Sequence, residues 1–114
     1  MASVSSRFVN GTLRTSVGVL DYEIAQEMAS ALGRSGCALE KSLQALAAFD
    51  AARQEHAADS KERRLLRRQL TAAAAQALWQ FIVQREACGL RDSRQIIREY
   101  QVPAEVRDRM GVFP

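Results

Sequence analysis

Residues 59–89, DSKERRLLRRQLTAAAAQALWQFIVQREACG, carry the signals that decide the fold. Asp59 followed by Glu62 has the spacing of a capping box, which marks the start of a helix. Gly89 stands where a left-handed C-terminal cap would end that helix. The alanine run 72–75 has small side chains, which allow another helix to pack closely against this part of the predicted helix. Apolar residues recur between the two ends at helical spacing, so the stretch predicts one long helix. The predicted apolar stripe consists of Leu66, Leu70, Ala73 or Ala74, Ala77, Phe81 and Cys88, widened by Leu78 and Ile82.

A second long helix is predicted before this one, over about residues 21–56, with Asp21 as its N-cap. Gly33 and Gly36 each cost a helix roughly 1 kcal/mol relative to alanine. They therefore either kink the helix or let another helix come close, and we expect one continuous helix. A turn at residues 56–59 would make the two helices an antiparallel hairpin. The stripe of the first helix consists of Ile24, Met28, Leu32, Leu39, Leu43, Leu46 and Phe49.

Two short helices are predicted to finish the chain. Asp92 with Gln95 repeats the capping-box spacing, and Pro103 would occupy the first position of the last helix, which Gly111 would cap. The fold class is therefore all-α, a long helical hairpin with two short C-terminal helices. We expect residues 1–18 to form a flexible arm and residues 19–114 a single helical domain.

Two helices alone cannot bury both sides of such apolar stripes. The short C-terminal helices can cover part of one arm, and a second copy of the chain can cover the rest. Pairing of two hairpins would make a four-helix bundle, so we expect a homodimer.

The composition is that of an ordinary globular domain: 114 residues, 47% hydrophobic, 25% charged, with a net charge of +3. This charge permits an anionic partner without requiring one. Cys37 and Cys88 are too few for a disulfide framework, and we expect both to be reduced thiols in the core.

The N-terminal residues 1–20 contain serines and arginines but no acidic residue, in weak similarity to an organellar transit peptide. The simpler interpretation is a flexible bacterial tail. The chain has no apolar stretch long enough to span a membrane and no signal-peptide core, so we expect a cytoplasmic protein.

A basic cluster lies near the start of the second helix: Lys61, Arg63, Arg64, Arg67 and Arg68. Arginine offers a planar fork of donors to phosphates, so this patch could bind nucleic acid. The alternative interpretation is a solvated helix face close to a turn.

The C-terminal segment can be interpreted as a degenerate helix-turn-helix that presents Arg107 and Arg109. Ile97 is bulky where that motif needs a small residue, and Gln101 occupies the turn position that usually holds glycine. Glu105 and Asp108, also in the second element, would repel phosphates. The favoured interpretation is a cap that packs on the hairpin through Ile96, Ile97, Tyr100, Val106 and Met110.

Candidate catalytic groups are few. The single histidine, His56, falls at the predicted turn, and no Glu-x-x-His spacing suggests a metal site in a helical bundle. Neither cysteine has a histidine partner in its own helix, and there is no phosphate-binding loop. The sequence therefore predicts no enzyme and no metal or cofactor site.

The stretches LDYEIAQE (20–27) and QREACGLRD (84–92), together with Tyr100-x-Val102-Pro103-x-Glu105-Val106 and Met110-Gly111, resemble a family of small helical bacterial proteins of unknown function. The resemblance covers about residues 20–111 and implies a bacterial origin. The polar residues of these stretches fall at the open end of the predicted hairpin. There they would either form a binding site or hold the short helices in place. The main members of this predicted polar cluster are Tyr22, Glu23, Glu27, Arg85 and Glu86.

These features together predict a non-enzymatic interaction or scaffold module, a homodimer that binds an unidentified protein partner. The alternative is a nucleic-acid-binding protein that uses the basic cluster, the C-terminal helices or both.

Overall fold

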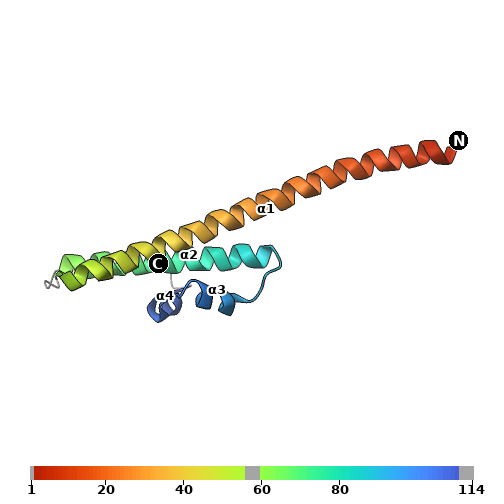
Figure 1. The fold of residues 1–114 in the computed structure, drawn as a ribbon. Helices are drawn as coiled ribbons and strands as arrows, with labels where there is room; N and C mark the ends of the chain where they lie inside the picture. Colours follow the sequence, from red (N-terminus) through yellow and green to blue (C-terminus); the bar gives the residue numbers. More distant parts are fainter. Residues whose placement is uncertain (1, 56–59, 111–114) are drawn as a thin grey trace. The chain divides into compact units, whose positions relative to one another are not determined.

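The computed structural model describes the backbone of residues 2–55 and 60–110, and the side chains of residues 17–52 and 60–110. Four helices follow one another: α1 (Ala2–Glu55), α2 (Lys61–Ala87), α3 (Ser93–Glu99) and α4 (Ala104–Arg109) (Figure 1). These described residues contain no strand, so the predicted all-α class is confirmed. The chain divides into two units, Met1–Ala31 and Leu32–Pro114, which are described separately below.

The first helix, α1, begins earlier than its sequence signals indicate. The predicted start at Asp21 is wrong, because the helix already runs from Ala2 and Asp21 is an interior residue. Its backbone thus includes residues 2–18, and the division into an arm and a domain at residue 18 stays a prediction. No proline interrupts this stretch, so nothing in its covalent structure stops the helix before Asp21.

In the second unit, α1 and α2 form the predicted antiparallel hairpin, and α1 is continuous through Gly33 and Gly36. Gly36 is buried, and a Cβ atom at this position would lie 3.2 Å from the Tyr100 hydroxyl and 3.3 Å from the Phe81 ring. The missing side chain therefore allows these two aromatic residues to approach the α1 backbone. A Cβ atom at Gly33 would meet nothing within 4 Å, so close approach explains only one of the two glycines.

The ends of α2 differ in part from the predicted capping. Ser60 is the N-cap, and its hydroxyl accepts a hydrogen bond from the Arg63 amide at 3.2 Å. The predicted cap Asp59 lies outside the described residues, as does His56. Gly89 has a φ of +85°, which confirms the predicted left-handed position after the helix.

The short helices begin close to where the sequence places them. Asp92 caps α3 by accepting a hydrogen bond from the Arg94 amide at 3.2 Å. The Gln95 side chain, which was predicted to complete a capping box with Asp92, donates a hydrogen bond to the Glu99 carboxylate at 2.8 Å. Pro103 is the N-cap of α4 and not its first helical residue, a shift of one position. The predicted cap Gly111 lies outside the described residues.

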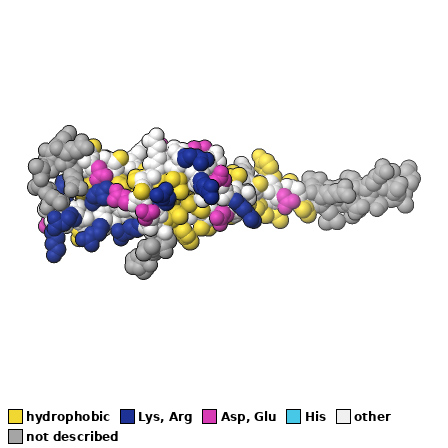
Figure 2. Space-filling model, turned by 90° about the horizontal axis from the view of Figure 1, so that it is seen from below, with side chains coloured by type: hydrophobic (Ala, Val, Ile, Leu, Met, Phe, Trp, Pro, Cys, Tyr) yellow, Lys and Arg dark blue, Asp and Glu magenta, His cyan; other side chains and the backbone are white. Residues whose placement is uncertain are grey.

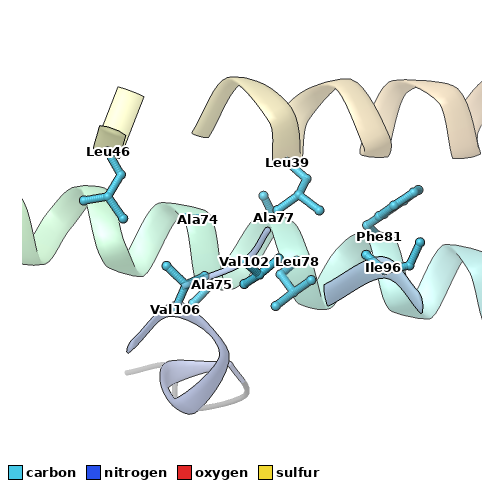
Figure 3. Packing of buried hydrophobic residues seen from close by; sticks show 10 residues of the cluster. All are labelled: Leu39, Leu46, Ala74, Ala75, Ala77, Leu78, Phe81, Ile96, Val102 and Val106. Carbon is cyan, nitrogen blue, oxygen red and sulfur yellow. The ribbon is translucent and has the colours of Figure 1, made fainter. Parts of the chain in front are cut away.

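The core of the second unit lies along the side of α2 that faces α1 and the C-terminal helices (Figure 3). From α1, Leu39 and Leu46 point toward α2, and α3, α4 and their connection bring Ile96, Val106 and Val102 to the same core. The predicted packing of the C-terminal helices onto the hairpin is therefore confirmed, and it adds Val102 to the expected residues. On α2 itself the buried residues are Thr71, Ala74, Ala75, Ala77, Leu78 and Phe81.

The cysteines are not core residues. Cys37 is exposed and Cys88 is half-buried, and both are free thiols. The core position predicted for Cys37 is wrong because it lies two residues before Leu39, on a side of α1 that faces away from α2. Within the described residues, every helix is too short or too polar to cross a membrane.

Candidate functional site

The predicted basic cluster divides into two sets of side chains. Lys61, Arg64 and Arg68 are exposed, whereas Arg63 and Arg67 are half-buried. On the face seen in Figure 2, Lys and Arg side chains gather toward the loop end of the hairpin, with Asp and Glu among them. The five residues therefore do not form one continuous cationic surface.

Arg67 connects three helices through its guanidinium group. Its Nε and Nη2 atoms donate to the two carboxylate oxygens of Asp50 on α1, at 2.8 and 3.1 Å. Its Nη1 and Nη2 atoms donate to Glu105 on α4, at 2.7 and 2.5 Å. The side chain of Arg67 is 26% exposed. These hydrogen bonds hold α1 and α4 against α2. Because they use donors on both edges of the guanidinium group, Arg67 has no free pair of donors for a phosphate.

This ion pair changes the acidity of both partners. The hydrogen bonds from Arg67 lower the pKa of Glu105, although partial burial opposes the change. The hydrogen bonds to Glu105 and Asp50 raise the pKa of Arg67. Both groups are already charged at neutral pH, and the direction of the two shifts shows that the folded state favours their charged forms.

Arg63 is directed inward for a different reason. Its guanidinium carbon lies 4.9 Å from the centre of the Phe49 ring, in a cation–π contact between α2 and α1. The Nε and Nη2 atoms are buried and have no hydrogen-bond partner among the described residues. Arg63 thus covers the end of the core with its side chain and is poorly placed to reach a nucleic acid.

The connection between α3 and α4 has one feature of a helix-turn-helix. Gln101 has a φ of +51°, the left-handed conformation for which such turns use glycine. However, α4 is only six residues long, and Val106 in its centre is completely buried against the core. Arg109 is half-buried. The Nε atom of Arg107 lies 3.7 Å from a carboxylate oxygen of Asp108, with which it forms an ion pair. The helix is therefore used mainly for packing.

A groove of about 990 Å³ separates α1 from the α3–α4 connection. Leu43, Leu46 and Ala47 supply apolar surface from α1, and Tyr100 and Pro103 supply it from the opposite wall. The charged residues of its lining are all acidic: Glu40, Asp50 and Glu99. The groove is thus partly apolar and partly polar, and one of its three carboxylates, Asp50, is already bound to Arg67.

A second apolar surface lies on the outer side of α2, opposite the core. Leu65, Ala72, Trp79 and Val83 are spaced by seven, seven and four residues, which places them along one face of a helix. Leu65 is 53% exposed, Trp79 45% and Val83 42%. We call this surface the outer face of α2. It makes α2 a helix with two apolar sides, of which the fold covers one.

The predicted polar cluster is divided between the two units. Tyr22, Glu23 and Glu27 belong to the first unit, and Arg85 and Glu86 to the second. Arg85 lies over the Phe81 ring, with its guanidinium carbon 5.9 Å from the ring centre. The cluster itself stays a prediction.

Two functional features were missed by the sequence reasoning. Arg67 was predicted only as a member of the basic cluster and Asp50 was given no role, although both lie about equally far from the predicted turn at residues 56–59 and so come near each other in an antiparallel hairpin. Their similar distances from the turn could have revealed the Asp50–Arg67 pair. The contact of Arg67 with Glu105 and the groove both depend on how α3 and α4 fold back, for which the sequence contains no local signal. No group of three His, Cys, Asp or Glu side chains that could hold a metal ion occurs in the described part of the chain.

The fold and these surfaces define a small all-α protein, a helical hairpin covered on one side by two short helices. The chain belongs to the family of unknown function DUF6665, which matches residues 8–114. No curated protein and no solved structure matches this chain. The predicted resemblance to a small helical family of unknown function is thereby confirmed.

Proposed function

We propose that this protein is a non-enzymatic interaction module that works as a homodimer, with the outer face of α2 as its central contact. The observation that carries the proposal is the second apolar side of α2, where Leu65, Trp79 and Val83 remain about half exposed. Exposed aromatic and aliphatic residues that lie in a row mark contact surfaces more often than isolated ones do.

A two-fold axis near residues 75 and 76 would suit this face. Two antiparallel copies of α2 would then place Trp79 of one copy opposite Ala72 of the other, a large side chain against a small one. The same arrangement brings the basic start of α2, with Arg64 and Arg68, toward Glu86 near the end of the partner helix. The four long helices would then lie side by side, a flatter assembly than the four-helix bundle predicted from the apolar stripes, because α1 packs on the opposite side of α2.

The alternative, nucleic-acid binding through the basic cluster, is less well supported. Arg67 is occupied by Asp50 and Glu105, and Arg63 covers Phe49. Lys61, Arg64 and Arg68 remain exposed. Three exposed cations favour general attraction to anions over recognition of a sequence. The proposal retains a bacterial cytoplasmic location, in which both free thiols stay reduced.

Sedimentation velocity of the full chain at micromolar concentration tests the proposal. The wild type is expected to have twice the 12.6 kDa mass of one protomer. The double variant Trp79→Gln/Val83→Lys is expected to be a monomer that keeps its helical circular dichroism. Its matched control is Ala38→Gln/Ala45→Lys, which introduces the same two side chains at exposed positions of α1, away from the outer face of α2. A wild-type chain that sediments as one protomer would refute the proposal.

A further inference from the structure

The outer face of α2 carries charges of opposite sign at its two ends. Trp79 follows Arg68 by eleven residues and precedes Glu86 by seven, which is close to three and two helical turns, so the three side chains share one side of the helix. Arg68 and Glu86 are both exposed. Within the described part of the chain, neither of them forms an ion pair. The face is therefore positive near the start of α2 and negative near its end.

The two edges of the outer face also differ in charge. Arg68 and Glu86 lie along one edge, which we call the charged edge. The other edge carries Gln69, Gln76 and Gln80, which are exposed and spaced by seven and four residues. Between residues 68 and 86 this second edge has no charged residue, and we call it the amide edge.

The direction of a partner helix decides which edges come together. A two-fold axis perpendicular to two antiparallel helices brings like edges together, whereas an axis parallel to two parallel helices brings unlike edges together. With the axis near residues 75 and 76, the antiparallel pair places Arg68 within about 5 Å, one helical turn, of the partner's Glu86 along the helix. It also places Gln76 beside its own copy. A parallel pair would instead press both charges against glutamines, where no opposite charge compensates for the lost water.

We infer that Arg68 and Glu86 select the antiparallel orientation of the dimer by forming two identical ion pairs, each between Arg68 of one copy and Glu86 of the other. A face that is positive at one end and negative at the other is complementary to itself only when it is turned end for end, which favours a second copy of the chain as the occupant. The inference rests on the proposed dimer and names the residues that fix its orientation. Because each pair occurs twice in a two-fold dimer, one substitution changes two contacts.

Charge reversal tests these pairs by sedimentation equilibrium of the full chain at low and at near-physiological salt. Arg68→Glu should raise the dissociation constant about tenfold or more at low salt, and less at higher salt, because it brings carboxylates together at two sites. Arg68→Glu/Glu86→Arg should return the dissociation constant to within about threefold of the wild type, since the charges are exchanged and not removed. The control Lys41→Glu makes the same change in net charge as Arg68→Glu at an exposed position of α1. It should also stay within about threefold of the wild type, because distant charges are screened.

Disulfide cross-linking measures the orientation directly, in a chain whose own thiols are removed by Cys37→Ser/Cys88→Ser. In the antiparallel dimer, Gln76→Cys can form a disulfide across the two-fold axis. The two Ala72→Cys sites would be about 10 Å apart along the helices, which is beyond the reach of a disulfide. In a parallel dimer, the two Ala72→Cys sites would instead be adjacent. Cross-linking of Gln76→Cys but not of Ala72→Cys is therefore expected.

The outcomes separate this inference from the proposed function. The selected orientation is overturned by an effect of Arg68→Glu no larger than that of Lys41→Glu, by no recovery in the exchanged variant, or by cross-linking of Ala72→Cys in place of Gln76→Cys. Each of these results leaves the outer face of α2 as the dimer contact if Trp79→Gln/Val83→Lys still makes the chain monomeric. A wild-type chain with the mass of one protomer overturns both. The melting temperature of each variant shows whether the protomer is folded.

Discussion

Both sides of α2 carry large apolar residues, but only one side is buried by the fold. The inner side buries Ala74, Leu78 and Phe81 between α1 and the C-terminal helices. The outer side carries Leu65, Trp79 and Val83, yet the fold leaves these side chains about half exposed. Apolar residues on the inner side therefore stabilise the protomer, whereas the proposed dimer contact would use those on the outer side. Substitutions on the two sides should differ in which equilibrium they change.

The largest effect is expected from the inner side. Leu78 is completely buried, and Leu78→Ala should lower the free energy of unfolding by about 3 kcal/mol through lost transfer energy and a residual cavity. Leu65→Ala on the outer face should change the unfolding of the isolated protomer by about 0.5 kcal/mol or less. Urea unfolding of both variants in the monomeric Trp79→Gln/Val83→Lys background measures the difference. Equal losses would contradict the division between the two sides.

The next effect concerns the clamp that holds α4 against the inner side. Arg67→Ala should cost about 1–2 kcal/mol, because it breaks a network of charge-assisted hydrogen bonds and leaves Asp50 and Glu105 without their shared cation. The neighbouring Arg68→Ala removes an exposed arginine and should stay within about 0.5 kcal/mol of the wild type. Thermal unfolding followed by circular dichroism distinguishes the two. A loss as large in Arg68→Ala would mean that only net charge matters.

The same clamp predicts a dependence of stability on pH. The pKa of Glu105 is lowered in the folded state, so its contribution is fully present above the usual glutamate value of 4.5. The contribution is lost as the pH falls below that value, through the lowered pKa. The difference in free energy of unfolding between wild type and Glu105→Gln should therefore shrink from pH 6 toward pH 3. A difference that stays constant over this range would show that the carboxylate charge contributes nothing.

The smallest effect compares two glycines of α1 that the sequence does not distinguish. Gly33→Ala should stabilise the protein by roughly 0.5–1 kcal/mol, because alanine favours the helix and its Cβ meets nothing within 4 Å. Gly36→Ala should lose that gain or become destabilising, since its Cβ would lie 3.2 Å from the Tyr100 hydroxyl. Paired denaturation curves of the two variants measure the contrast. A gain of the same size at both sites would mean that the aromatic residues can shift at no cost.

Much of this architecture could be predicted from local patterns. The helical hairpin, the end of α2 before Gly89 and the cap at Asp92 follow from short-range rules of periodicity and capping. The start of α1 was misplaced at Asp21 because a good capping residue can also lie inside a helix. The N-cap at Ser60 was missed because the neighbouring Asp59 matches a stronger motif.

The surfaces were harder to predict than the helices. Whether an arginine near the turn is solvated or clamped depends on residues distant in the chain, as Arg67 shows through its contact with Glu105. The outer face of α2 was also hidden in the sequence, because periodicity shows that Trp79 and Val83 are apolar but not which side the C-terminal helices cover.

The most direct test of the central claim uses Trp79, the single tryptophan of the chain, as a reporter on the outer face of α2. Its fluorescence emission maximum should be recorded over a dilution series from high micromolar to low nanomolar concentration, beside sedimentation of the same samples. If the outer face of α2 is the dimer contact, emission is blue-shifted in the dimer and moves to longer wavelength as the mass falls to one protomer. An emission maximum that stays constant while the dimer dissociates would contradict the account, as would a chain that remains a monomer at every concentration.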